Sequence, residues 1–414
     1  MWCRLLRWQR SGVVCALALL FWPLTVVAAG NGIKVGSGRL HTSIEIETHD
    51  VQNPGYVAEN PINDVYLLGR PVASLAFDGD MQLELKAELE YRQYLGVIES
   101  ATRNFSRMAG SFGGHLVINP TGALVFRLNE TFMRLADAAN QTISTRLLHI
   151  VNIVGASVDY KPGGGALVVN VGYSLWYDRY DRDQVNLTFR PAALDSLRQL
   201  PTAKATWKFL PLTALLLEVQ GVLTSYPGGG TYAWDDSTKN EEIDILKVEI
   251  GAVGNITSTL SALIKVGYGK LFADETDALP LVGQLELSYD ADQRIKVRAG
   301  VLQTMHPTTF FRYFTQMRLY AGTEYLFLPT SQIRLHVTYD FQKYGKSLMT
   351  NDTNPRRNDG VLAGEIDIAH QFNDMLSLAL IERLAYRDSN YRTSAGMLAG
   401  YLQNDLFLRF TVAY

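Results

Sequence analysis

Cysteine is almost absent from this sequence. Among 414 residues only Cys3 and Cys15 are cysteines, and both lie in the first 29 residues. The rest of the chain therefore has no disulfide and no thiolate metal site. Beyond residue 30 it also lacks an apolar run of 18 residues, so no helix is expected to span a membrane. The formal net charge is only −3, which argues against nucleic acid as a partner.

Motifs for catalysis and cofactor binding are missing as well. The sequence has no Gly-x-Ser-x-Gly motif and no phosphate-binding loop. His41, Glu45 and His49 share one face of an expected strand. Positions four apart on a strand are about 13 Å apart, too far to bind one metal ion. We therefore expect no enzyme activity, no cofactor and no metal site.

The first 29 residues have the organisation of a secretory signal peptide. Gly12–Val27 is an apolar run, Ala29 is a small residue at the expected cleavage point, and the positive start is carried by Arg4, Arg7 and Arg10. A single membrane-anchoring helix is the weaker alternative, because Pro23 and small residues end the run. We divide the chain into a signal peptide, 1–29, and one domain, 30–414. Cleavage removes three arginines and no acid, so the net charge falls from −3 to −6.

A two-residue alternation recurs along the rest of the chain. From Met81 to Tyr91, apolar residues alternate with Gln82, Glu84, Lys86, Glu88 and Glu90. A strand places these two sets on opposite faces, whereas a helix would scatter them. Eighteen such segments follow the signal peptide, at 39–48, 65–76, 81–94, 107–118, 123–134, 146–160, 166–177, 203–210, 213–225, 244–253, 258–270, 281–289, 294–303, 312–326, 332–342, 361–371, 375–386 and 400–414.

The connections between these segments alternate strictly between short turns and longer loops. Eight are tight turns rich in Gly, Pro, Asn and Asp, such as Asp78-Gly79-Asp80, and nine are longer. An even-stranded outer-membrane barrel has this arrangement, with short periplasmic turns and long outer loops. The sequence therefore predicts an all-β fold: a transmembrane antiparallel β-barrel of about 18 strands in the bacterial outer membrane, with both termini in the periplasm. Three segments alternate poorly, so 16 strands is the alternative.

The last nine residues, 406–414, form a strand that ends on an aromatic carboxy terminus. They resemble the assembly signal of outer-membrane barrels, which implies two partners, the barrel assembly machinery and outer-membrane lipid. An edge strand of a soluble sandwich is the alternative. The signal residues are Leu406, Leu408, Phe410, Val412 and Tyr414. Tyrosines at segment ends are expected to form girdles on the apolar face; they are Tyr91, Tyr160, Tyr173, Tyr177, Tyr289, Tyr313, Tyr339 and Tyr414.

The polar face of each segment should line the lumen. Eighteen strands enclose a ring on the order of 35 Å across, too wide for side chains to fill. An acidic wall is predicted from Glu45, Glu47, Glu84, Glu88 and Glu90, and a basic wall from Arg294, Lys296, Arg298, Arg312, Arg318 and Arg334. The two walls nearly oppose each other, so they predict a transverse field across a water-filled pore. The alternative is that these charges only solvate and brace the wall.

Residues 178–202 form a long loop that we take as the candidate constriction of the pore. Trp176 lies beside it with lumen parity, where an exposed ring would stack on a sugar. The alternative for Trp176 is a side chain beneath a packed loop.

Three short sequence motifs carry a family resemblance: Asn63-Asp64-Val65, Leu89-Glu90-Tyr91-Arg92-Gln93-Tyr94-Leu95 and Trp207-Lys208-Phe209-Leu210-Pro211-Leu212-Thr213. They resemble a family of outer-membrane β-barrel porins associated with exopolysaccharide export in Gram-negative bacteria. The resemblance implies a passive path for polysaccharide secretion. Only residues 30–38 precede the first strand, so the polymer would be delivered by a separate periplasmic polysaccharide export protein. The alternative function is a general or solute-selective diffusion porin.

Overall fold

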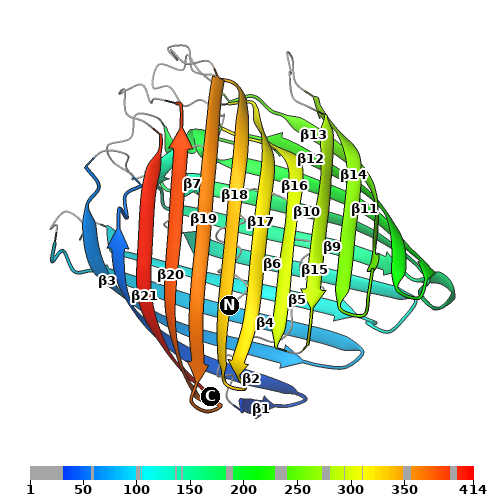
Figure 1. The fold of residues 1–414 in the computed structure, drawn as a ribbon, viewed down its shortest axis with the longest axis horizontal. Coiled ribbons are helices and arrows are strands. Elements are labelled where there is room, and N and C mark those ends of the chain that lie inside the picture. The colour runs from blue at the N-terminus through cyan, green and yellow to red at the C-terminus, as the bar shows by residue number, and fades with distance from the viewer. Residues whose placement is uncertain are drawn as a thin grey trace.

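The chain forms one closed antiparallel β-barrel of 18 strands (Figure 1). The computed structural model describes residues 31–56, 60–98, 103, 105–135, 138–140, 143–182, 190–228, 240–272, 280–292, 294–309, 311–347, 356–391 and 399–414. Consecutive strands pair around the ring, and the last strand pairs with the first. The predicted all-β barrel and its strand number are confirmed, and the alternative of 16 strands is wrong. The predicted signal peptide, 1–29, lies outside the described residues. Closure leaves no long free sheet edge, as a barrel in lipid requires.

The barrel strands coincide with the eighteen segments of alternating residues. They are β2 (Gly38–Gln52), β3 (Asn63–Phe77), β4 (Met81–Tyr94), β5 (Arg107–Ile118), β6 (Leu124–Leu135), β9 (His149–Tyr160), β10 (Leu167–Tyr180), β11 (Ser196–Leu210), β12 (Thr213–Ser225), β13 (Asp244–Asn255), β14 (Leu260–Phe272), β15 (Leu281–Asp290), β16 (Ile295–Pro307), β17 (Tyr313–Leu328), β18 (Ser331–Lys346), β19 (Arg356–Gln371), β20 (Leu376–Ser389) and β21 (Tyr401–Ala413). A separate hairpin, β7 (Ala138–Asn140) and β8 (Ile143–Arg146), lies between β6 and β9.

The seam between β2 and β21 closes the ring. Their register runs from Ser43 opposite Ala413 to Gln52 opposite Asn404. Tyr414 extends the pairing, since its N–H donates to the Thr42 carbonyl at 2.8 Å and its carbonyl accepts from the Thr42 N–H at 3.1 Å. Below it a short strand, β1 (Ile33–Val35), pairs with the start of β2. The last strand, with its terminal aromatic residue, therefore seals the barrel.

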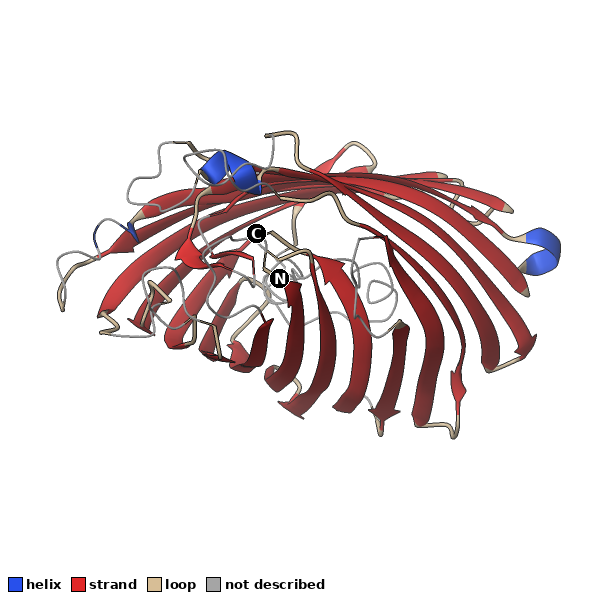
Figure 2. Ribbon diagram, turned by 90° about the horizontal axis from the view of Figure 1, so that it is seen from above, coloured by secondary structure: helices blue, strands red, loops and turns tan. Residues whose placement is uncertain are grey.

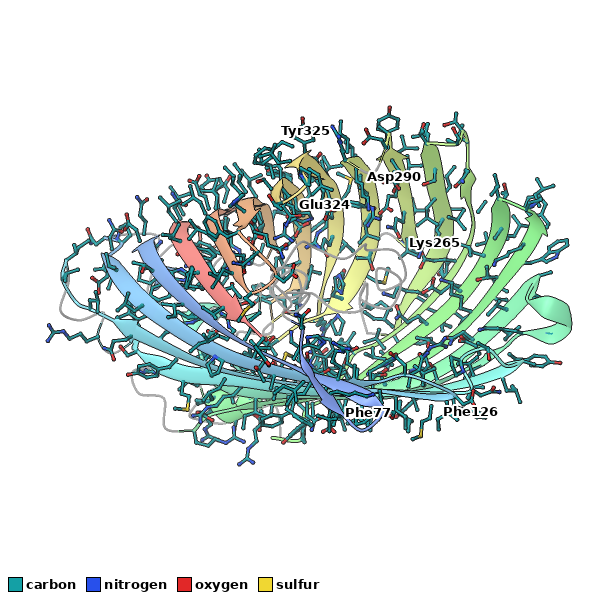
Figure 3. The ribbon with its side chains drawn as sticks, turned by 90° about the horizontal axis from the view of Figure 1, so that it is seen from below. Phe77, Phe126, Lys265, Asp290, Glu324 and Tyr325 are labelled. Atoms are coloured by element: carbon teal, nitrogen blue, oxygen red, sulfur yellow. The ribbon has the colours of Figure 1, made fainter. Side chains whose placement is uncertain are left out.

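The outer face of the wall is apolar and the inner face is polar. On β21, Leu406, Leu408 and Phe410 are exposed, whereas the alternate residues Phe407 and Arg409 are buried. In a view along the barrel, consecutive residues Glu324 and Tyr325 of β17 point to opposite sides of the wall (Figure 3). Large apolar residues are exposed in the same way on the other strands. This outward apolar band is the pattern of a transmembrane barrel.

Most of the predicted girdle tyrosines lie on the outer face. Tyr91, Tyr160, Tyr173, Tyr289 and Tyr414 are exposed, and Tyr177 and Tyr339 are partly exposed. Tyr313 is an exception, because it is buried at the start of β17 in an apolar cluster with Met305. Its placement on the outer face was wrong, because the start of β17 packs against buried apolar residues of β11 to β16.

The barrel has two unlike ends. The short turns and the carboxy terminus lie at one end, which we call the turn end, and the longer connections lie at the other, the loop end (Figure 1). Seen from above, the ring is flattened rather than circular (Figure 2). No helix among the described residues is long and apolar enough to cross a membrane.

The strand ends differ most from expectation around residues 178–202. β10 continues to Tyr180 and β11 begins at Ser196, so the connection is 181–195. The described part contains a short 3-10 helix, η5 (Pro191–Leu194), and residues 183–189 lie outside the described residues. The predicted loop was too long because inward-facing charges, such as Arg198, interrupt the apolar pattern at the strand start.

Candidate functional site

The inner surface of the barrel carries charged residues on most strands, and their pairing defines the candidate site. Arg70 of β3 lies at the centre of the predicted acidic wall. Its Nη1 donates to Glu45 Oε2 at 2.6 Å, and its Nη2 donates to Glu90 Oε2 at 2.5 Å. Across the seam, Arg409 Nε donates to Glu47 Oε1 at 2.7 Å. Glu47, Arg70 and Glu90 are all buried, so these carboxylates are neutralised by arginines on neighbouring strands.

The rest of the predicted acidic wall lies on β4. Arg92 Nε donates to Glu90 Oε1 at 2.6 Å, and Lys86 Nζ lies 2.6 Å from Glu88 Oε1. Glu84 is exposed near the turn end and lies opposite His115 of β5 in the register. The acidic wall is thus a set of carboxylates with cations interleaved.

The predicted basic wall is compensated in the same way. Arg318 of β17 makes a bidentate ion pair with Asp340 of β18, with N–O distances of 2.6 and 2.7 Å. Arg334 pairs with Asp367 on β19. Arg298 Nε lies 3.3 Å from Glu286 Oε1 on β15. Each arginine therefore finds its carboxylate on an adjacent strand.

Three remaining members of that wall occupy different settings. Lys296 lies opposite Glu324 in the β16–β17 register. Arg294 lies in the turn before β16, and Arg312 precedes β17 with its Nε 2.7 Å from Glu241 Oε2. Arg294 and Arg312 therefore belong to the two ends of the barrel and not to its strand wall.

The lumen is accordingly lined by paired charges of both signs on both sides of the ring. This geometry favours the alternative in which the charges brace the wall. It does not favour two opposed walls of opposite sign. The sequence analysis missed Arg70, Arg409 and Asp340 because cross-strand register is not readable from alternation. Their inward parity was the available signal, since each stands at an inward-facing position of its strand.

A histidine at the seam joins three strands. The His49 ring stacks between the rings of Tyr66 and Phe407, at centroid distances of 4.0 and 4.1 Å. Its two ring nitrogens lie 2.8 Å from Glu47 Oε2 and 2.8 Å from Asp405 Oδ1. This contact strengthens the closure between the first and last strands. Among the described residues, no group of three histidine, cysteine or carboxylate side chains is placed to hold a metal ion.

Trp176 faces the lumen as its parity predicts, but its side chain is only partly exposed. The Arg198 guanidinium carbon lies 4.4 Å from the ring centroid, and the indole Nε1 donates to Asp178 Oδ1 at 3.2 Å. Apolar residues of two inner clusters also pack against it. This environment favours the packed alternative over an exposed sugar-stacking surface.

The loop end is crossed by an apolar cluster, which we call the loop-end bridge. β10 and β18, which both contribute to it, are eight strands apart in one direction and ten in the other. Its members on the β9–β11 side are Leu147, Tyr180, Ala193 and Leu194, and those on the β17–β21 side are Phe311, Phe314, Tyr344, Tyr391 and Ala399. The bridge therefore joins opposite sides of the ring. The candidate constriction at 178–202 contributes to it through η5.

A second set of contacts fixes the bridge to the connection before β13. Asn240 Nδ2 donates to the Ala193 carbonyl at 2.7 Å, and Glu241 pairs with Arg312. Buried Asp195 holds the end of η5, because its Oδ1 accepts from the Tyr180 N–H at 2.9 Å and its Oδ2 pairs with Arg182 at 2.5 Å. Three connections thus meet at the loop end.

Comparison with known proteins gives similarity of fold at very low identity. No family model matches the chain, and no curated protein matches it. Among solved structures it is similar to the ferric enterobactin receptor PfeA, with 10% identity, a TM-score of 0.48, and 91% of this chain and 81% of that chain covered. It is also similar to Acinetobacter baumannii OccAB3 (10%, TM-score 0.45, 91% and 99% covered) and to Pseudomonas aeruginosa OpdQ (10%, TM-score 0.44, 90% and 99% covered). At this level of similarity the comparison carries no functional conclusion.

Proposed function

We propose that this chain is an outer-membrane channel that passes small polar solutes selectively. One observation carries the proposal: a closed 18-strand wall that is apolar outside and lined inside by paired charges. A soluble barrel would need the reverse arrangement, since its outer face meets water. An 18-strand ring is also too wide for its own side chains to fill.

The two ends suggest an orientation in the membrane. Short turns face the periplasm in outer-membrane barrels, so we place the turn end, with the carboxy terminus, on that side. The loop end then faces outward. In this setting the partners are outer-membrane lipid along the apolar band and the barrel assembly machinery that would bind the terminal strand.

Selectivity is supported by the loop-end bridge and the paired charges. Because the bridge crosses the lumen, a solute must pass beside it rather than through an open bore. Side by side, arginines and carboxylates offer donors and acceptors to the same solute, which suits a neutral or dipolar polar molecule better than a single ion.

Secretion of an exopolysaccharide is the competing function, and it would need a periplasmic polysaccharide export protein as partner. This competing function rests on the family resemblance of three short sequence motifs. A polymer needs a wide path and benefits from open aromatic surfaces, but the bridge crosses the mouth and Arg198 covers Trp176. We therefore favour the solute channel.

Reconstituted protein separates the two functions. In proteoliposome swelling assays, mono- and disaccharides should enter at rates that fall steeply with size. A deletion strain should take up small polar nutrients more slowly and keep its surface polysaccharide. Loss of the polysaccharide with unchanged permeability would overturn the solute channel and support export.

A further inference from the structure

One arginine at the loop end is enclosed more completely than any lumen ion pair described above. Arg357, near the start of β19, has no exposed side-chain surface. Its Nε and Nη2 donate to both oxygens of Asp359, at 2.6 to 2.9 Å. Asp359 in turn accepts from the Ser389 hydroxyl at 2.5 Å. A buried charge of this kind is stable only when it is fully paired.

Three aromatic rings complete the enclosure, which we call the Arg357 cage. The guanidinium carbon lies 4.7 Å from the ring centroid of Tyr344, 5.4 Å from that of Tyr391 and 5.7 Å from that of Phe311. A cation within about 6 Å of an aromatic centroid is attracted by the ring, most strongly when it is desolvated. The rings come from β18, from the segment after β20 and from the segment before β17.

The cage rings belong to the loop-end bridge. Phe311, Tyr344 and Tyr391 form one side of it, and Ala193 and Leu194 of η5 form the other. The rings also contact each other, with centroids 5.2 Å apart for Phe311–Tyr344 and 5.4 Å apart for Phe311–Tyr391. The guanidinium therefore holds together the surface against which η5 packs.

We propose that Asp359 and the three aromatic rings form a guanidinium-binding site that the Arg357 side chain occupies. While this site is filled, the loop-end bridge stays closed across the pore. Without the cation, the three rings lose their common centre and Asp359 is left buried with less compensation. The segment containing Phe311 then separates from Tyr344 and Tyr391, η5 loses its packing surface, and the mouth opens. Opening of the mouth affects transport only if the chain is a channel, so this consequence rests on the proposed function. The opening itself is tested by labelling, which does not depend on that function.

The test uses two readouts of Arg357→Ala in the full chain. The first is single-channel current in planar bilayers, which should rise in the variant and return toward the wild-type value with ethylguanidinium in the bath. The second is accessibility: with Leu194→Cys in place, maleimide labelling should become about tenfold faster when Arg357→Ala is added, because the bridge opens more often. Ethylguanidinium should slow the labelling again.

Arg134→Ala is the matched control. Arg134 also lies near the loop end and pairs with a carboxylate, Asp181, at 3.4 Å, but its side chain is half exposed, whereas that of Arg357 is wholly buried. Neither readout should change in this variant. If Arg357→Ala fails to assemble, Arg357→Lys keeps the charge but loses the planar fork, and it should give an intermediate labelling rate.

The outcomes separate the inference from the channel function. Equal labelling rates with and without the Arg357 substitution would overturn the inference, provided that both proteins are folded barrels whose gel migration changes on heating. Faster labelling that ethylguanidinium does not reverse would also overturn it, because the site would not bind guanidinium. Faster, reversible labelling in a protein that passes no current would uphold the guanidinium site and count against the channel function.

Discussion

The loop end and the turn end of the lumen use the same residue types in opposite ways. At the loop end, Arg357 and Asp359 are wholly buried beneath aromatic rings. Toward the turn end, Arg127 and Lys86 also have carboxylate partners, but about a third of each side chain stays exposed. An ion pair in water contributes little to stability, whereas a buried pair is costly to break. The Arg357–Asp359 pair therefore holds one arrangement at the loop end, whereas the ion pairs toward the turn end remain partly solvated.

Breaking one ion pair from each region should give the largest difference. Arg318→Ala removes a buried, two-pronged partner of Asp340, and it should destabilise the barrel by about 3–5 kcal/mol. Arg298→Ala removes a partly exposed pair nearer the turn end, and it should cost only about 0–1 kcal/mol. Denaturant titration of each variant in detergent measures the difference. Equal losses would mean that burial does not distinguish the two regions.

A charge on the outer face of β21 should depend on depth. Leu408→Arg places a cation well inside the apolar band and should cost about 2–4 kcal/mol, enough to impair assembly. Leu402→Arg, on the same face at the loop end, should cost about 0–1 kcal/mol. The fraction of heat-modifiable barrel in outer-membrane extracts measures both. If Leu402→Arg were the worse variant, the apolar band would have been placed at the wrong height.

Ion selectivity should respond modestly at the turn end. Replacing Arg294, Lys296 and Arg298 together by Gln removes three positive charges from the wetter part of the lumen, so selectivity should shift toward cations. The shift should be small, because Glu286 already neutralises part of this charge. Reversal potentials in a salt gradient measure it, with Arg134→Gln as the control. A shift toward anions would contradict the placement of these residues in the ion path.

The smallest effect is expected at Trp176. Because Arg198 lies over its ring, Trp176→Ala should leave the entry rates of neutral sugars unchanged in swelling assays. A marked fall in disaccharide entry, with no fall for monosaccharides, would show that the ring meets sugars after all. Phe132→Ala, on the outer face, is the matched aromatic control.

The sequence alone determined the wall of this protein. Strand number, closure at Tyr414 and the inward or outward direction of residues such as Glu47 and Leu408 follow from two-residue alternation and turn chemistry, both of which are local. The tertiary structure decided what the inward residues do. Arg409 meets Glu47 across 362 residues, and η5 meets Phe311 across the ring. Register and loop docking depend on contacts between distant segments, and alternation along one strand carries no information about them.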